Sequence, residues 1–189
     1  MTPSEEIWGL DVASTTGVCE GVPGQTPRLY TVRLAAGEDD HGASFAKAIK
    51  WMAQRLLVSH PRAIIIEAPI PAAAMNGATN ANTLAVLWGL AACIEGTARA
   101  KSIPVRRVNI QRVRKNFLGI GNLKGPEAKR RTVALCKALG WEPPNHDAAD
   151  AAAVWHLGCT MFARDLAHRV DPISLAAMRG LSDDLGGSA

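Results

Sequence analysis

The sequence has few cysteines, and none of them form a CxxC pair. Its four cysteines, Cys19, Cys93, Cys136 and Cys159, are scattered along the chain. His156 and Cys159 could together supply two zinc ligands, but no second pair of the same kind accompanies them. A structural zinc site and a disulfide framework are therefore both disfavoured, and buried thiols are expected instead.

Long apolar runs are also missing. No stretch reaches the length of a membrane span, and the N-terminus lacks a basic region followed by an apolar segment. We therefore expect a cytoplasmic protein without a membrane partner. The length of 189 residues suits one domain with a real core, which we place at residues 1–168. Residues 169–189 are expected to form a tail that is partly mobile.

Acidic residues are almost absent from one basic segment. Between Pro104 and Thr132 only Glu127 is acidic, although the net charge of the whole chain is only +4. The basic residues of this segment are Arg106, Arg107, Arg112, Arg114, Lys115, Lys124, Lys129, Arg130 and Arg131. Such a local block is typical of proteins that bind a phosphate backbone. A solvated cationic face is the alternative.

The periodicity of apolar residues predicts an α/β fold. Strands are predicted over residues 6–12, 17–22, 28–34, 63–67 and 103–109. Helices are predicted over residues 43–58, 79–100, 109–118, 127–139 and 147–168. Three strands at the start, followed by crossovers through helices, indicate a mixed sheet with helices on both faces. Ligands of such sheets bind beyond the carboxyl ends of the strands.

Two acids stand at the ends of apolar strands. Asp11 closes the first strand, and Glu67 closes "AIIIE". Burial disfavours a charge at such positions. If the two strands are neighbours, the two carboxylates meet at one edge of the sheet. Taken singly, Asp11 could be a turn residue and Glu67 could belong to an ion pair.

A second pair of acids begins the last helix, in "NHDAADAAAVWHLG" at residues 145–158. Asp147 and Asp150 are three residues apart and share one helix face. They could simply be capping residues at the positive end of a helix dipole. They could instead complete a site with Asp11 and Glu67. Four carboxylates together would repel one another, and Mg²⁺ or Mn²⁺ would remove that penalty.

These residues carry a resemblance to the RuvC family of Holliday-junction resolvases, which has the RNase H-like fold. The resemblance covers about residues 6–160. The matching segments are "IWGLDVASTTGVC", "AIIIEAPI", "NGATNANTLAVLWGLAACIEG", "VNIQRVRKNFLGIGNLKGPEAKRRTV" and "NHDAADAAAVWHLG". It implies a five-stranded mixed sheet flanked by helices on both faces.

The resemblance also implies an activity. Members of this family are Mg²⁺-dependent homodimeric endonucleases that nick a four-way DNA junction symmetrically and leave 5′-phosphate ends. In family terms Asp11 bridges two ions, Glu67 binds one, and Asp147 and Asp150 complete the site. Mn²⁺ is expected to substitute for Mg²⁺. His146 matches no ligand of the family and would support Asp147 or lie at the surface.

Further positions follow from the same resemblance. Lys124 falls where a lysine assists catalysis, but the segment is longer than usual, and Lys129 is its rival. The expected DNA-binding residues are Asn76, Asn80, Arg112, Arg114, Lys115, Lys124, Lys129 and Arg130. Thr79 and Asn82 could also reach phosphates. The loop after Glu67 departs from the family, because only Ile70 and Met75 could probe a junction there.

Other interpretations remain open at this stage. A nuclease of the same fold could debranch phage DNA, flaps or structured RNA. A non-catalytic module could bind junctions without using the acids. A nucleotide-binding actin-like domain shares "LDVASTTG", but it would need a second phosphate loop. The sequence names no branch-migration helicase or phage packaging partner, and it does not separate a host enzyme from a phage one.

Overall fold

A five-stranded mixed sheet forms the centre of the protein. The computed structural model describes residues 4–35, 40–68 and 81–166. The strands are β1 (Ile7–Asp11), β2 (Thr15–Gly21), β3 (Arg28–Arg33), β4 (Ala63–Glu67) and β5 (Val105–Val108), in the order β3-β2-β1-β4-β5. The pairs β1–β2 and β2–β3 are antiparallel, whereas β1–β4 and β4–β5 are parallel. This arrangement confirms the predicted fold class.

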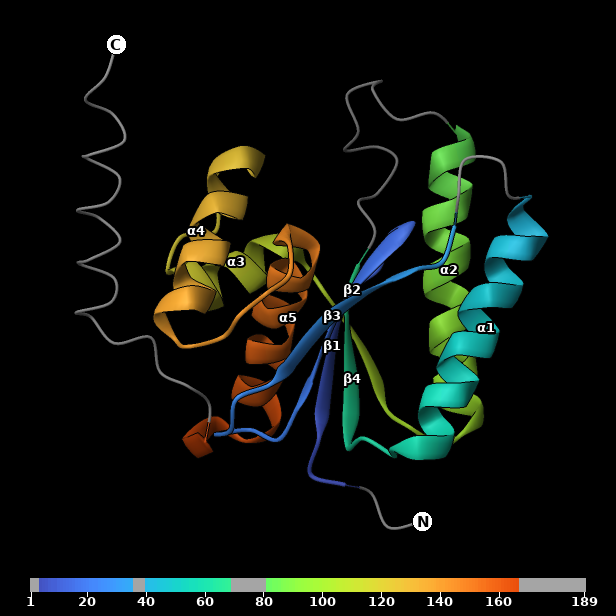
Figure 1. The fold of residues 1–189 in the computed structure, drawn as a ribbon, viewed down its shortest axis with the longest axis horizontal. Helices are drawn as coiled ribbons and strands as arrows, with labels where there is room; N and C mark the ends of the chain where they lie inside the picture. Colours follow the sequence, from blue (N-terminus) through green and yellow to red (C-terminus); the bar gives the residue numbers. More distant parts are fainter. Residues whose placement is uncertain (1–3, 36–39, 69–80, 167–189) are drawn as a thin grey trace.

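Helices cover both faces of this sheet. They are α1 (His41–Val58), α2 (Ala81–Ala100), α3 (Ile110–Leu118), α4 (Gly125–Ala138) and α5 (His146–Phe162), followed by a 3₁₀ turn at Arg164–Leu166. Figure 1 shows α1 and α2 on one face and α3, α4 and α5 on the other. No described helix has the length and apolar character needed to cross a membrane.

Three predicted helix boundaries were wrong by two residues or more, and one of them is the start of α1, which lies at His41 and not at residue 43. The last helix was predicted to reach His168, but α5 ends at Phe162, and Ala163 leaves the helical conformation. No glycine or proline marks this end, so the sequence carries no stop signal there. The helix predicted from Glu127 begins at Gly125, because Pro126 in its first turn already suits a helical backbone.

The alternation of side chains along β1 and β4 divides the core into two layers. Trp8 and Leu10 point toward α1 and α2, and Ile64 and Ile66 do the same. Residues at odd positions, such as Ile7, pack in the layer that contains α5. Successive side chains of a strand point to opposite faces. The last residue of each strand therefore faces the α5 side.

Helix α5 lies unusually close to the sheet because small residues line the contact. A Cβ atom on Gly9 of β1 would lie 2.3 Å from the backbone nitrogen of Trp155. A Cβ atom on Gly158 would lie 2.6 Å from Cγ1 of Ile65. The alanines of α5 at positions 148, 149, 151, 152 and 153 are all buried. The start of α5 is thereby held close to the edge where β1 and β4 end.

Candidate active site

Asp11 and Glu67 lie at the ends of neighbouring parallel strands. Leu10 of β1 is paired with Ile66 of β4, and the two acids are the next residues along each strand. Both follow the alternation that directs side chains toward α5, and both are partly buried. The prediction that β1 and the "AIIIE" strand are neighbours is confirmed, and the two carboxylates share one edge and one face.

The start of α5 brings a second pair of acids to the same edge. The side chain of Asn145 caps the helix by accepting a hydrogen bond from the backbone nitrogen of Ala148, at 3.0 Å. Asp147 and Asp150 therefore stand inside the helix, one turn apart, and neither supplies the N-cap. The helix-capping role is carried by Asn145, and both aspartates remain available for other chemistry.

Gly17 sets how closely Asp147 can approach Asp11. In the sheet Gly17 of β2 is paired directly with Asp11 of β1. A Cβ atom at Gly17 would lie only 2.0 Å from the backbone oxygen of Asp147. No side chain fits there, so the absence of one lets the first turn of α5 rest on the sheet beside Asp11. The sequence analysis missed this residue, although a glycine inside a strand is a known sign of close backbone approach.

Burial and neighbouring charges both raise the pKa values of these carboxyls. Burial, reinforced by the charges of Asp150 and Asp147, raises the pKa of Asp11 to about 7. Burial, with the charges of Asp11 and Asp150, raises the pKa of Glu67 to about 8. Opposite charges hold these values down only in part, and Lys129 acts on both groups. The edge of the sheet is thus a place where negative charge is costly.

Asp150 belongs to the same electrostatic cluster. Burial raises its pKa above the ordinary value for an aspartate. Lys129, Arg114 and His146 lower that pKa, while the charge of Asp147 raises it again. Asp11, Glu67, Asp147 and Asp150 are hereafter called the carboxylate cluster.

The donor chemistry of the carboxylate cluster suits a hard divalent cation. All its ligand atoms would be oxygens, which Mg²⁺ and Mn²⁺ prefer. A cation would also offset the mutual repulsion that raises the pKa values. Within residues 4–35, 40–68 and 81–166, however, no three Asp, Glu, His or Cys side chains converge closely enough to form a ready set of ligands. The cluster therefore has oxygen ligands of the right kind, but the structure does not hold three of these side chains close enough together to form a metal site.

Two cations from the basic segment reach the carboxylate cluster. Lys129 of α4 lies with Nζ 4.0 Å from Oδ1 of Asp147. Arg114 of α3 lowers the pKa of Glu67 and of Asp150. Arg114 is also held in place by donating a hydrogen bond to the backbone oxygen of Leu123, at 3.0 Å. The exposed ring of His146 approaches from the solvent side, with Nε2 3.2 Å from Oδ1 of Asp147.

Lys124, the other candidate for the catalytic lysine, lies in a different position from Lys129. It occupies the N-cap position of α4, is exposed, and makes no side-chain cap hydrogen bond. No ion pair links it to a carboxylate in the described part of the chain. Of the two candidate lysines, only Lys129 therefore contacts the carboxylate cluster in this structure.

The other expected DNA-binding residues fall into two groups. Arg112 and Lys115 on α3 and Arg130 on α4 are exposed. Asn76 and Asn80 lie outside the described residues, as do Ile70, Met75 and Thr79. Asn82 is exposed near the start of α2.

The basic segment is less uniform than its sequence indicates. Arg107 is paired with Glu95 of α2 at 2.7 Å, and its guanidinium lies over the ring of Trp88. Arg131 is paired with Glu127 at 2.6 Å, one turn away on α4. These two arginines are therefore partly neutralised by contacts within the protein. The sequence could have suggested the second pair, because it has the spacing of a helical ion pair.

His156 and three of the four cysteines are buried, whereas Cys93 is half-buried. The side chain of His156 is buried, and its Nδ1 lies 2.8 Å from Oδ1 of Asn116 on α3. Cys19, Cys136 and Cys159 are buried, and burial raises the pKa of each thiol. This agrees with the expectation of buried thiols. Such thiols react poorly, because the thiolate is the reactive form.

Comparison with known proteins identifies structures with a similar fold. No protein-family model matches the sequence, and no curated protein matches it. RuvC from Thermus thermophilus has a similar structure, with a TM-score of 0.61 at 15% identity over 86% of this chain and 98% of that one.

Two further solved structures are similar in the same way. The complex of T. thermophilus RuvC with a Holliday junction substrate gives a TM-score of 0.62 at 16% identity, over 82% of this chain and 93% of that one. The yeast mitochondrial Holliday junction resolvase Ydc2 gives 0.55 at 12% identity, over 81% of this chain and 77% of that one. These similarities establish an RNase H-like fold of the kind found in RuvC.

Proposed function

We propose that this protein is a structure-selective DNA endonuclease that resolves four-way junctions by metal-dependent nicking. The observation that carries the proposal is the carboxylate cluster, which gathers four acids at the carboxyl ends of β1 and β4 beneath the start of α5. Burial and mutual repulsion make this arrangement costly, so it calls for a compensating function. Solved junction resolvases with the same fold support the choice of substrate.

The carboxylate cluster would hold the metal ions of the reaction. The charge of Asp11 acts on Glu67, and those of Asp147 and Asp150 act on Asp11, so Asp11 would contribute to both sides of the site. Mg²⁺ is the expected ion, with Mn²⁺ as a substitute. When bound, two such ions activate a water molecule and stabilise the leaving oxygen in phosphodiester hydrolysis.

The surrounding residues prepare the site for a phosphate. Asp11, with a pKa of about 7, and Glu67, with a pKa of about 8, must lose their protons before they can act as ligands. Lys129 favours that loss at both groups through its positive charge, and Arg114 favours it at Glu67. The same charges attract the DNA backbone toward the edge of the sheet.

The protein would select a four-way junction by the shape of the DNA. Contacts with phosphates position a protein on DNA but carry no sequence information directly. We propose that the protein acts as a homodimer, whose two carboxylate clusters nick two strands symmetrically. The products would carry 5′-phosphate and 3′-hydroxyl ends, which a ligase can join.

A cleavage assay tests this proposal. The purified protein is mixed with Mg²⁺ and with three labelled substrates: an immobile four-way junction, a three-way branch and a linear duplex. An Asp11→Asn variant and a chelator serve as negative controls. Asp165→Asn is the matched control, because Asp165 is exposed in the 3₁₀ turn beyond the far end of α5.

Each outcome has a definite meaning. We expect paired symmetric nicks in the junction. These nicks should be lost in Asp11→Asn and in the presence of the chelator, and they should be kept in Asp165→Asn. Equal cutting of the three-way branch would replace the resolvase by a nuclease that debranches other nucleic acids. Tight junction binding without any cutting in Mg²⁺ or Mn²⁺ would leave a junction-binding module, and the proposal of an endonuclease would be wrong.

A further inference from the structure

A short chain of side-chain hydrogen bonds joins α3 to α5. Nδ1 of His156 lies 2.8 Å from Oδ1 of Asn116, and Nδ2 of Asn116 donates to Oγ1 of Thr160 at 3.2 Å. The hydroxyl of Thr160 in turn donates to the backbone oxygen of His156, at 3.0 Å. Asn116, His156 and Thr160 are hereafter called the α3–α5 clamp. None of them belongs to the carboxylate cluster.

The directions of these bonds decide which atoms donate. The one proton of the Thr160 hydroxyl goes to the backbone oxygen of His156, so Oγ1 of Thr160 accepts from the amide of Asn116. The side-chain carbonyl of Asn116 then faces His156, whose Nδ1 carries a proton and donates. His156 is only 4% exposed. A bond at such a buried position is costly to break, because no water replaces the lost partner.

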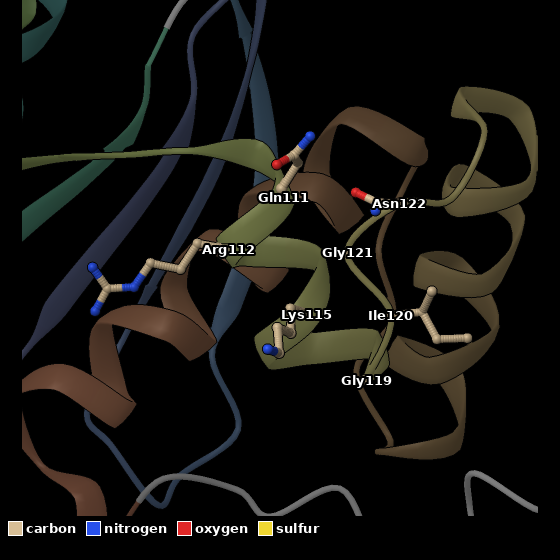
Figure 2. A pocket seen from close by; sticks show the side chains of 7 residues that line it. All are labelled: Gln111, Arg112, Lys115, Gly119, Ile120, Gly121 and Asn122. Carbon is tan, nitrogen blue, oxygen red and sulfur yellow. The ribbon is translucent and has the colours of Figure 1, made fainter.

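Helix α3 presents different side chains to the core and to solvent. Val113 and Phe117 are buried and form an apolar ridge in the core layer that contains α5. On the opposite side of the helix, Gln111, Arg112 and Lys115 are exposed (Figure 2). An apolar ridge holds a helix on its neighbour, but it does not by itself fix the rotation of the helix about its own axis, because hydrophobic contact is non-directional.

Asn116 and Arg114 stand on opposite sides of this ridge. Successive residues of a helix are about 100° apart around its axis, so Arg114 is about 100° from Val113 in one direction and Asn116 about 60° in the other. The positive charge of Arg114 acts on two members of the carboxylate cluster. A rotation of α3 that moved Asn116 away from His156 would therefore move Arg114 relative to the cluster.

We propose that the α3–α5 clamp positions Arg114 at the carboxylate cluster by fixing the rotation of α3. This inference rests on the proposed function and deepens it, because it assigns positioning residues that lie outside the site. His156 is six residues from Asp150 along α5, a distance of about 9 Å. The clamp therefore affects cleavage through Arg114, from one to two turns away along α5.

A double-mutant cycle between Asn116 and Arg114 tests the inference. Asn116→Leu removes the amide at similar volume, and its effect on kcat/KM for a four-way junction is measured in the parent and in Arg114→Gln. If the clamp acts through Arg114, the loss should be smaller in the Arg114→Gln background, by about twofold or more. An equal loss in both backgrounds would overturn the inference, because Asn116 would then support only the fold.

Thr160 provides a matched pair of variants in case Asn116→Leu does not fold. Valine resembles threonine in shape but has no hydroxyl, whereas serine keeps it. Thr160→Val should lower kcat/KM in the parent and much less in Arg114→Gln, and Thr160→Ser should restore activity. Equal losses with valine and serine would count against the hydroxyl.

Thr97→Val is the control for the loss of a threonine hydroxyl. Oγ1 of Thr97 donates to the backbone oxygen of Cys93 within α2, on the other face of the sheet. This variant also loses a hydrogen bond of the helix, but it should leave cleavage unchanged. Thermal unfolding verifies that each variant is folded.

The side-chain signal of Arg114 separates this inference from the proposed function, because it is recorded without DNA. Its Nε–H peak in a proton–nitrogen NMR spectrum is assigned by its absence in Arg114→Gln. The peak should move in Asn116→Leu and Thr160→Val and stay in place in Thr97→Val. An unmoved peak would overturn the inference and leave the endonuclease intact. A moved peak in a protein that cuts no DNA would overturn the endonuclease and keep the clamp as a support of Arg114.

Discussion

At the scale of single residues, the ionisation of Asp11 and Glu67 connects stability with function. Folding places both carboxyls where burial and neighbouring acids oppose their charge. A group of this kind weakens the folded state when it is ionised and strengthens the binding of cations that remove the penalty. In the proposed site, the same two residues would therefore couple the pH of the solution both to folding and to metal binding.

Without divalent ions, the stability of the protein is expected to fall as the pH rises from about 4 to about 8. The folded carboxyls of Asp11 and Glu67 have pKa values of about 7 and about 8, above the ordinary values of 3.8 and 4.5. Between these limits the folded state binds more protons than the unfolded state, so the free energy of unfolding decreases with pH. Thermal unfolding in EDTA at a series of pH values measures the effect.

The Asp11→Asn variant isolates the contribution of one carboxyl. Because asparagine carries no proton to lose, the variant should gain stability relative to the parent as the pH rises, by more than about 1 kcal/mol at pH 8. Asp165→Asn should follow the parent throughout. Parallel curves for Asp11→Asn and the parent would show that the charge of Asp11 is not penalised in the folded state.

Lys129 and Lys124 are expected to differ in the pH dependence of cleavage. Lys129 lowers the pKa of Asp11, Glu67 and Asp150, so Lys129→Gln should move the rising limb of the profile to higher pH by up to about one unit. Lys124→Gln should leave the profile in place. Measurement of kcat/KM against pH on a four-way junction decides between them. A shift with Lys124→Gln alone would identify Lys124 as the lysine that acts on the carboxylates.

At the scale of elements, the site depends on how closely α5 lies on the sheet. Three glycines remove the side chains that would otherwise separate the two: Gly9 and Gly17 from the sheet and Gly158 from the helix. Alanines cover the rest of the contact. The first turn of α5 is thereby held beside the ends of β1 and β4, and the two pairs of acids become one cluster.

Gly17→Ala is expected to destabilise the protein and to reduce cleavage. The new Cβ would lie 2.0 Å from the backbone oxygen of Asp147. Because this oxygen belongs to the first turn of α5, it can move away only if the start of α5 moves with it. Overpacking of this kind costs about 1–3 kcal/mol. Urea unfolding and the junction assay measure the two effects.

Gly96→Ala is the matched control for this substitution. Gly96 lies inside α2, and a Cβ atom there would meet nothing within 4 Å. Alanine should therefore stabilise this helix by up to about 1 kcal/mol and leave cleavage unchanged. A Gly17→Ala variant as stable and as active as Gly96→Ala would show that α5 does not need this close approach.

At the scale of the whole molecule, the elements needed for the site lie within residues 4–166. The sheet, both core layers and the carboxylate cluster belong to this part of the chain. A chain ending after His168 is therefore expected to keep the unfolding temperature and the cleavage activity of the full chain. Unfolding scans, the junction assay and light scattering for the state of association test this. Loss of a dimer on truncation would show that residues 169–189 take part in association.

The sequence by itself indicated the fold class and the four acidic residues that were expected to lie together. Apolar periodicity predicted all five strands, and the helical crossovers between the later strands indicated the two parallel pairs. Because acids rarely follow apolar strands without a reason, Asp11 and Glu67 stood out from local pattern alone. These features depend on neighbours in the chain, which a sequence displays directly.

The tertiary structure decided which groups meet. It made Asn145 the cap of α5, brought Lys129 to Asp147, paired Arg107 with Glu95, and gave Gly17 its place under α5. It also gave the cations of α3 different surroundings, because Arg114 acts on Glu67 and Asp150 whereas Arg112 and Lys115 are exposed. Most of these contacts join residues that are far apart in the chain, and the approach of two packed elements depends on the side chains of both. No local pattern carries that information.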